Sequence, residues 1–285
     1  MIEIRNTLIK SLVVNSLLVI IKIFFGIIGK SYSLVADGVH SFSDLVTDLV
    51  SIIGNKLSLK PEDTKHPYGH GKYEYITSMG IGLFIIILGG SIIFNFSKDN
   101  ILVPSIYIIG VSALTIIIKY VLAHYLYTKG IIYNNQILLS NSKEGTADVI
   151  GSIFVLIANI LVHFSNTFNV LKYSDMLASI IVGLFIIKAG FDILKTNISI
   201  MLGEQETDEE CIENIKKIIT KYEQIKKLDN LVVLKYGPYY KIILEISMCS
   251  ELKLKEAHDI GDLIENSIKE NNSKYKYITI HINPY

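Results

Sequence analysis

The sequence predicts an all-α membrane domain of six helical spans followed by a smaller cytoplasmic α+β domain. Half of the 285 residues are hydrophobic and the mean hydropathy is +0.43, which is too apolar for an ordinary soluble protein of this length. The apolar residues lie in the first two thirds of the chain, whereas the remainder is polar and charged. We therefore predict a six-span transmembrane domain at residues 1–203 and a second domain at residues 204–285.

Six stretches are long and apolar enough to cross a bilayer, which requires about 20 residues per helix. They cover residues 8–28, 33–56, 76–96, 102–126, 138–163 and 176–197. Basic residues between the spans are unevenly distributed, and cytoplasmic loops carry the excess of such residues. One side would carry Arg5, Lys10, Lys56, Lys60, Lys65, Lys72, Lys129, Lys143 and the lysine-rich tail, and the other only Lys30, Lys98 and Lys172. This bias predicts that both termini are cytoplasmic.

The tail reads as helix, strand, strand, helix and strand. "TDEECIENIKKIITKYEQ" starts with Thr207 as a helix cap, and "KEAHDIGDLIENSIKE" is a second amphipathic helix. "NLVVLKYG" and "YYKIILEISMC" are two strands around a Gly-Pro turn at 237–238, and "KYKYITIHI" is a third. This α-β-β-α-β order is typical of a ferredoxin-like or metallochaperone-like α+β domain with its helices on one face of the sheet.

Charge and cysteine content exclude some functions. Lys and Arg together number 27, as do Asp and Glu, so the net charge is zero and no nucleic-acid partner is indicated. Cys211 and Cys249 form no CxxC motif, which argues against a disulfide framework and favours a reducing compartment for the tail.

The second predicted span contains ionisable residues that are costly at membrane depth unless they face a partner or a water-filled cavity. His40, Asp44 and Asp48 follow i, i+4, i+8 spacing and therefore share one helix face. The alternative is a buried polar network that only holds helices together. The regular stripe favours a ligand-binding face.

The fifth span repeats this pattern, with Glu144 and Asp148 at i, i+4. If the two stripes face each other, His40, Asp44, Glu144 and Asp148 form a metal site of one imidazole and three carboxylates. Four ligands suit Zn²⁺, whereas the excess of oxygen donors favours Mn²⁺ or Fe²⁺. Glu144 follows Lys143, so it can alternatively be a residue at the cytoplasmic edge of the span.

The loop "EDTKHPYGHGKYE" supplies Asp63, His66 and His70 as further candidate ligands. His-x3-His is a metal-binding spacing on a helix, but Pro67 and Gly69 make this segment a turn. A capping loop with exposed histidines is therefore the alternative interpretation.

Two lysines and several small or acidic residues in the apolar runs have structural interpretations. We expect Lys119 to extend to the cytoplasmic edge and Lys22 to pair with an intramembrane carboxylate, with Asp48 as the candidate. Asp37 and Asp175 are expected to be structural or entry-path residues and not ligands. Gly38, Gly89 and Gly90 are expected to allow close helix contact.

Three segments resemble the cation diffusion facilitator family: "SLVADGVHSFSDLVTDLVSIIG", "KPEDTKHPYGHGKYE" and "NSKEGTADVIGSI", followed by a short α/β tail. The resemblance covers residues 8–285, and residues 31–74 are its most specific part. It implies six spans, cytoplasmic termini, a homodimer assembled through the tail, and export of divalent metal in exchange for protons. It also implies a transport site at His40, Asp44, Glu144 and Asp148 and a loop site at Asp63, His66 and His70.

The resemblance is less clear in the tail and at one transport ligand. His258 and His281 match positions where the family often binds metal. Asp229 and Glu245 stand where relatives often have histidine, and Asn283 where they often have aspartate, so a tail without metal is the alternative. Zinc-exporting members usually have histidine at the position of Glu144, and manganese-type members asparagine or aspartate, so the metal's identity stays open among Zn²⁺, Mn²⁺ and Fe²⁺.

Two other functions compete with a secondary transporter. A membrane metalloenzyme would need a nucleophile or base beside an open metal position, and the sequence contains neither HExxH nor GxSxG. A membrane-anchored metal-sensing or scaffold dimer would not need His40, Asp44, Glu144 and Asp148 in the bilayer. We therefore expect a multi-pass transporter whose divalent metal is cargo, with structural metal in the loop and tail as an open question. The Asn-, Ile- and Lys-rich composition fits a bacterial inner membrane.

Overall fold

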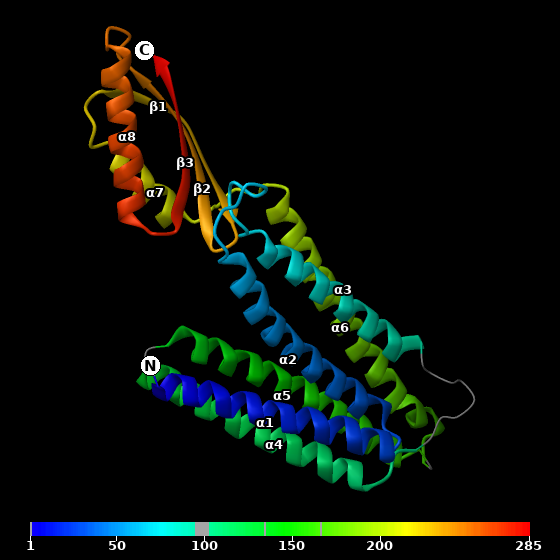
Figure 1. The fold of residues 1–285 in the computed structure, drawn as a ribbon. Helices are drawn as coiled ribbons and strands as arrows, with labels where there is room; N and C mark the ends of the chain where they lie inside the picture. Colours follow the sequence, from blue (N-terminus) through cyan, green and yellow to red (C-terminus); the bar gives the residue numbers. More distant parts are fainter. Residues whose placement is uncertain (1, 95–102, 134, 166) are drawn as a thin grey trace. The chain divides into compact units, whose positions relative to one another are not determined.

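The structure is a computed structural model that describes residues 2–94, 103–133, 135–165 and 167–285. Its described residues form six long helices, a short 3-10 helix, and a smaller α+β part (Figure 1). The long helices are α1 (Ile2–Ile28), α2 (Tyr32–Ser58), α3 (Tyr73–Phe94), α4 (Tyr107–Ile132), α5 (Gln136–His163) and α6 (Ser174–Met201), with η1 (Asn169–Tyr173) before α6. The later elements are α7 (Glu209–Ile219), β1 (Ile225–Tyr236), β2 (Tyr239–Met248), α8 (Leu254–Asn271) and β3 (Tyr275–Pro284).

Most helices are longer than their predicted apolar stretches, because polar flanking residues continue the helical hydrogen bonding. The fourth helix is also displaced along the chain: it runs from Tyr107 to Ile132 and not from 102 to 126. Pro104 disfavours helical geometry at Val103, and the Ser105 N–H instead bonds the Gly29 carbonyl at 2.9 Å. Residues 95 and 96 of the third predicted span and residue 102 of the fourth lie outside the described residues.

Among the described helices, five are long and apolar enough to cross a membrane: α1, α3, α4, α5 and α6. Their outer faces present large apolar side chains, such as Ile20, Ile87 and Ile150, that are more than half exposed. These faces suit a lipid solvent. The second helix has 27 residues but carries three aspartates, which reduce its apolar character.

The chain divides into two compact units. The first comprises Met1–Leu49 and Ile81–Asp192, and the second comprises Val50–Gly80 and Ile193–Tyr285. In the first unit, α4 packs along α5 and α1 packs along α4 (Figure 1). One buried apolar cluster fills these contacts, with Leu122 and Leu126 of α4 packed against Leu138 of α5. A second cluster joins Leu34 of α2 to α4 and α5.

Helices α3 and α6 approach closely at glycines. A Cβ at Gly89 would lie 2.9 Å from the Gly183 carbonyl oxygen, and a Cβ at Gly190 would lie 2.7 Å from that of Gly82. Only a residue without a side chain permits this approach. The expectation of close contact is confirmed for Gly89 and for Gly38, whose Cβ would lie 2.7 Å from Ile23. It is wrong for Gly90, which has open space around its Cβ position.

In the second unit, the tail confirms the predicted order α-β-β-α-β. Its sheet has the order β1-β2-β3, with β2 antiparallel to β1 and parallel to β3. Helices α7 and α8 contact each other and share one buried apolar core with the strands (Figure 1). The predicted Thr207 cap is wrong, because Asp208 caps α7 by accepting a bond from the Glu210 N–H.

The β1–β2 connection confirms the predicted Gly-Pro turn. Gly237 has φ +61°, a conformation that favours glycine, and it occupies the first central position of the two-residue hairpin loop. Its N–H donates to the Tyr75 hydroxyl at 2.6 Å. The first strand starts at Ile225, five residues before the prediction, because two register irregularities accommodate its polar beginning.

Candidate metal site

Helices α2 and α5 bring three of the predicted ligands together in the first unit. One donor atom each of His40, Asp44 and Asp148 lies within 4.8 Å of the others. His40 Nε2 is 4.0 Å from Asp148 Oδ1, and the Asp148 side chain is only 9 % exposed. Among the described residues, Asp44 Oδ2 is buried without a hydrogen-bond partner. A buried, unpaired carboxylate oxygen beside an imidazole and a second carboxylate is a donor set suited to a cation.

The fourth predicted ligand, Glu144, lies outside this group. It is exposed and precedes Asp148 by one helical turn, so the two residues share a face of α5. Glu144 is close enough to Asp44 and Asp148 for electrostatic interaction. The structure thus groups three of the four predicted ligands and leaves the fourth near them. Asp48, the last residue of the α2 stripe, is exposed.

A lysine that the sequence interpretation assigned elsewhere is part of this site. Lys119 Nζ lies 2.8 Å from Asp148 Oδ2 and 2.9 Å from Asn15 Oδ1, and its side chain is 11 % exposed. The expectation that Lys119 extends to the cytoplasmic edge is therefore wrong. Ser112, Thr115 and Lys119 form a polar stripe on the buried face of α4, and this spacing is the signal that would have revealed its direction.

The second membrane-depth lysine also has a different partner from the expected one. Lys22 Nζ lies 2.8 Å from Asp37 Oδ2, and both side chains are almost fully buried. Lys22 also donates to Ser41 and Ser152, and the Ser152 hydroxyl donates to Asp37. The expected pairing with Asp48 is wrong. The pair neutralises both charges within the helix contacts, so Asp37 has the structural role expected of it.

Asp175 holds the start of α2. Its carboxylate accepts bonds from the hydroxyls of Ser31 and Ser33 and from the backbone N–H groups of Tyr32 and Ser33. The first N–H groups of a helix have no intrahelical partner, and here a residue of α6 satisfies two of them. This arrangement fixes the end of the helix that carries His40 and Asp44.

The loop between α2 and α3 forms a second group of candidate ligands, in the second unit. His66 Nδ1 lies 3.0 Å from Asp63 Oδ1, and His70 Nε2 lies 3.3 Å from Asp63 Oδ2. The backbone N–H of His66 donates to Asp63 at 2.7 Å, and this bond lowers the pKa of the Asp63 carboxyl. His70 Nδ1 lies 3.0 Å from the Pro61 carbonyl oxygen, which can only accept, so Nδ1 is the donor of this bond and Nε2 is the nitrogen that faces Asp63.

The sheet of the tail contacts this loop directly. Glu62 lies 2.7 Å from Lys276 Nζ and accepts a 2.8 Å bond from the Tyr277 hydroxyl. The bond from Lys276 is the largest of the effects that lower the pKa of Glu62 to about 2. Lys241 Nζ lies 4.3 Å from the centroid of the Tyr68 ring. The residues next to Asp63 and His70 are thus held by β2 and β3.

The two tail histidines are not grouped with other ligands in the described part of this single chain. His258 is exposed and lies 3.5 Å from Asp262, one turn away on α8. His281 is exposed and pairs in register with Glu245. Asp229 is bonded to Lys227 and Ser247, and Lys227 lowers the pKa of its carboxyl.

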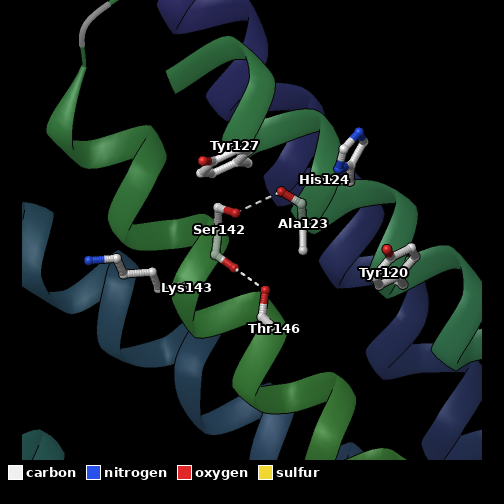
Figure 2. A pocket seen from close by; sticks show the side chains of 7 residues that line it. All are labelled: Tyr120, Ala123, His124, Tyr127, Ser142, Lys143 and Thr146. Carbon is white, nitrogen blue, oxygen red and sulfur yellow. Dashed lines mark hydrogen bonds between the residues drawn. The ribbon is translucent and has the colours of Figure 1, made fainter. Parts of the chain in front are cut away.

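A cavity of about 350 Å³ lies between α4 and α5, apart from these ligands. Its lining includes Tyr120, Tyr127 and Lys143 (Figure 2). The hydroxyls of Ser142 and Thr146 donate to the carbonyls of Ala123 and Ser142 (Figure 2). The lining of the cavity contains none of the predicted ligands.

The chain matches known families along almost its whole length. Residues 8–202 match the cation efflux transmembrane domain, and residues 207–285 match the cytoplasmic domain of cation efflux proteins.

Three relatives align with most of the chain. A manganese efflux system protein, MneP, of Bacillus subtilis is 29 % identical over 99 % of this chain and 96 % of its own length. An uncharacterised transporter of Methanocaldococcus jannaschii is 31 % identical over 98 % of this chain and 99 % of its own length. A second manganese efflux system protein of B. subtilis, MneS, is 26 % identical over 93 % of this chain and 90 % of its own length.

Proposed function

Because this chain belongs to the cation diffusion facilitator, or cation efflux, family, whose members are metal-ion transporters and not enzymes, we propose that it exports divalent transition-metal cations from the cytoplasm. His40, Asp44, Asp148 and Glu144 would bind the ion, and protons would move in the opposite direction.

One observation supports this site above the others. His40, Asp44 and Asp148 converge in the helical part of the chain, and Asp44 Oδ2 is buried without a partner among the described residues. A membrane anchor or scaffold would gain nothing from such a group, because each ionisable side chain at membrane depth costs free energy. A sensing or scaffold dimer without transport remains the second candidate, supported by the loop group of Asp63, His66 and His70.

The donor atoms favour Mn²⁺ or Fe²⁺ over Zn²⁺. The site offers one imidazole nitrogen, and every other donor is a carboxylate oxygen, which suits harder ions. Two relatives are named as manganese efflux proteins, which agrees with this order. The loop histidines would hold a structural metal, and His258 and His281 would contribute metal ligands in the tail.

Proton exchange follows from the chemistry of the donors. Metal binding requires a neutral imidazole and ionised carboxylates, so protons and metal compete for one set of atoms. Histidine as a residue type changes its charge within the physiological pH range. A site open to the cytoplasm would load metal, and a site open to a more acidic exterior would take up protons and release it. Rocking of the helices around the fixed site would provide the two openings.

We also propose how the chain spans the membrane and assembles. The second helix would be the sixth span, because Asp37 is paired with Lys22 of α1, and His40 and Asp44 converge on Asp148 of α5 and not on lipid. Residues 1–203 would form the transmembrane domain, and residues 204–285 a cytoplasmic domain that joins two copies into a homodimer. Both termini would lie in the cytoplasm of a bacterial cell, with the spans in its inner membrane.

The test is metal-driven proton flux in proteoliposomes, measured for Mn²⁺, Fe²⁺, Zn²⁺ and Cd²⁺. We expect flux to be largest with Mn²⁺ or Fe²⁺, and Asp44→Ala to abolish it. We also expect His40→Ala to weaken both metal affinity and the dependence on a pH gradient. Flux that is largest with Zn²⁺ would contradict the metal order alone. A folded dimer without flux for any ion would favour the sensing or scaffold function.

A further inference from the structure

We propose that Lys119 is a fixed counter-charge of the transport site, which keeps the metal-loaded site electrically neutral and thereby limits its affinity for the ion. This inference rests on the proposed function. It assigns a role in tuning metal affinity to a residue that does not itself bind metal.

The two oxygens of Asp148 face different groups. Oδ2 lies 2.8 Å from Lys119 Nζ, whereas Oδ1 lies 4.0 Å from His40 Nε2. An ion bound by His40 and Asp44 would therefore contact Asp148 Oδ1, and the ion pair between Asp148 Oδ2 and Lys119 would stay intact. Asp148 would bind the ion through one oxygen only, and Lys119 would stay in place during binding.

Lys119 is held by three helices. It extends from α4, its ammonium donates to Asn15 of α1 at 2.9 Å, and its ion pair is with Asp148 of α5. Gly145 of α5 lies beside the aliphatic part, since a Cβ there would make ordinary van der Waals contact with Lys119 Cε at 3.7 Å. With the side chain 11 % exposed, water screens its charge little, and its effect on nearby groups is correspondingly strong. These contacts place the positive charge beside the site.

The charges explain why the site needs a lysine. Asp44, Asp148 and Glu144 carry three negative charges when ionised, and a divalent ion cancels only two of them. Lys119 supplies the one positive charge that cancels the third. Among the described residues of this unit, the other buried lysine is Lys22, which is paired with Asp37 and contributes no further charge. Asp48, the remaining carboxylate of the α2 stripe, is exposed and is left out of this count. On this count, removal of the Glu144 charge makes the positive charge of Lys119 unnecessary.

The experiment measures the Mn²⁺ dissociation constant of the full-length protein in nanodiscs, taking only the component of binding that Asp44→Ala abolishes. We expect Lys119→Met to tighten this binding roughly tenfold or more, because the divalent ion loses a nearby repulsive charge. Lys119→Arg keeps the charge and should stay within about threefold of the unmodified protein. Lys188→Met, at an exposed lysine of α6, is the matched control and should change nothing.

Charge compensation is tested by a double variant. Glu144→Gln alone should weaken binding, and Lys119→Met with Glu144→Gln should return the dissociation constant to within about threefold of the unmodified protein. If Lys119 only stabilised the packing of the helices, the opposite result would be expected. Lys119→Met would then weaken Mn²⁺ binding, and adding Glu144→Gln would weaken it further. That result would overturn the proposal.

A second variant covers the case in which Lys119→Met does not fold. Asn15→Asp places a carboxylate 2.9 Å from the ammonium and offsets its charge without removing the lysine. It should also tighten Mn²⁺ binding, and unchanged or weaker binding would again overturn the proposal. If Asp44→Ala abolishes no binding at all, the transport site itself is wrong. If it does abolish binding but neither charge change tightens it, the counter-charge alone is wrong.

Discussion

Single side chains fix the position of the α2 ligand face, and Asp175 is the clearest case. It accepts four hydrogen bonds from the start of α2, although it belongs to α6. We predict that Asp175→Ala lowers the free energy of unfolding by about 2–4 kcal/mol, because two backbone N–H groups lose their partner. Thermal unfolding in detergent measures the change. Asp192→Ala, at an exposed residue of the same helix, is the control, and equal melting temperatures for the two variants would contradict the prediction.

Glu62 connects the loop ligands to the sheet by charge. Its pKa of about 2 lies below the ordinary value of 4.5, chiefly because Lys276 donates to it. A depressed pKa means that these contacts stabilise the folded chain above pH 4.5, and that this stabilisation is lost as the pH falls towards 2. We predict that Lys276→Met raises the pKa of Glu62 towards 4.5.

Carboxyl NMR titration of the full-length protein measures this shift. Lys274→Met is the matched control, because Lys274 is an exposed lysine two residues away. The same titration curve for Glu62 in both variants would show that Lys276 does not hold it.

At the scale of residues, the spacing along the sequence predicted which side chains share a helix face, but not which residues on other helices they contact. His40 and Asp44 share a face because four residues are close to one helical turn, which is a local property. Partner choice depends on how each helix is rotated against its neighbours. Lys22 therefore pairs with Asp37 and not Asp48, and Lys119 turns inwards to Asp148.

At the scale of elements, two neighbouring glycines of α3 test the close approach to α6. A Cβ at Gly89 would lie 2.8 Å from Ile187 and 2.9 Å from the Gly183 carbonyl, whereas Gly90 has open space. We predict that Gly89→Ala destabilises the protein by about 1–3 kcal/mol through overpacking, and that Gly90→Ala is neutral or slightly stabilising. Melting temperatures of the two variants decide this, and a larger loss for Gly90→Ala would contradict it.

Element boundaries were predictable where local chemistry sets them. The Gly-Pro turn at 237–238 ends β1 because the backbone geometry of the loop requires it. The start of α4 and the first residues of β1 were missed. Pro104 prevents the apolar run from starting as a helix at 102, so α4 starts at Tyr107. The polar first residues of β1 form a strand only because they pair with β2. Strand pairing joins residues distant in sequence, so local patterns report it poorly.

At the scale of the whole molecule, the tail contains its own apolar core. The buried cluster that joins α7, α8 and the sheet draws all its members from residues 211–275. We predict that a fragment of residues 204–285 folds alone, with cooperative thermal unfolding followed by circular dichroism. Sedimentation equilibrium should show a dimer. Gradual melting would indicate that the core depends on the remainder of the chain, and a folded monomer would contradict the homodimer proposal.

The ion pairs of Lys22 and Lys119 bear on how the chain enters a membrane. Lys22 of α1 forms an ion pair with Asp37 of α2, and Lys119 of α4 forms an ion pair with Asp148 of α5. In each case the partner lies on the next helix to leave the ribosome. Consecutive helices can therefore pass from the insertion machinery into lipid as hairpins with paired charges, so that neither lysine faces hydrocarbon alone. In each pair the lysine is synthesised first, and the aspartate that neutralises it follows on the next helix.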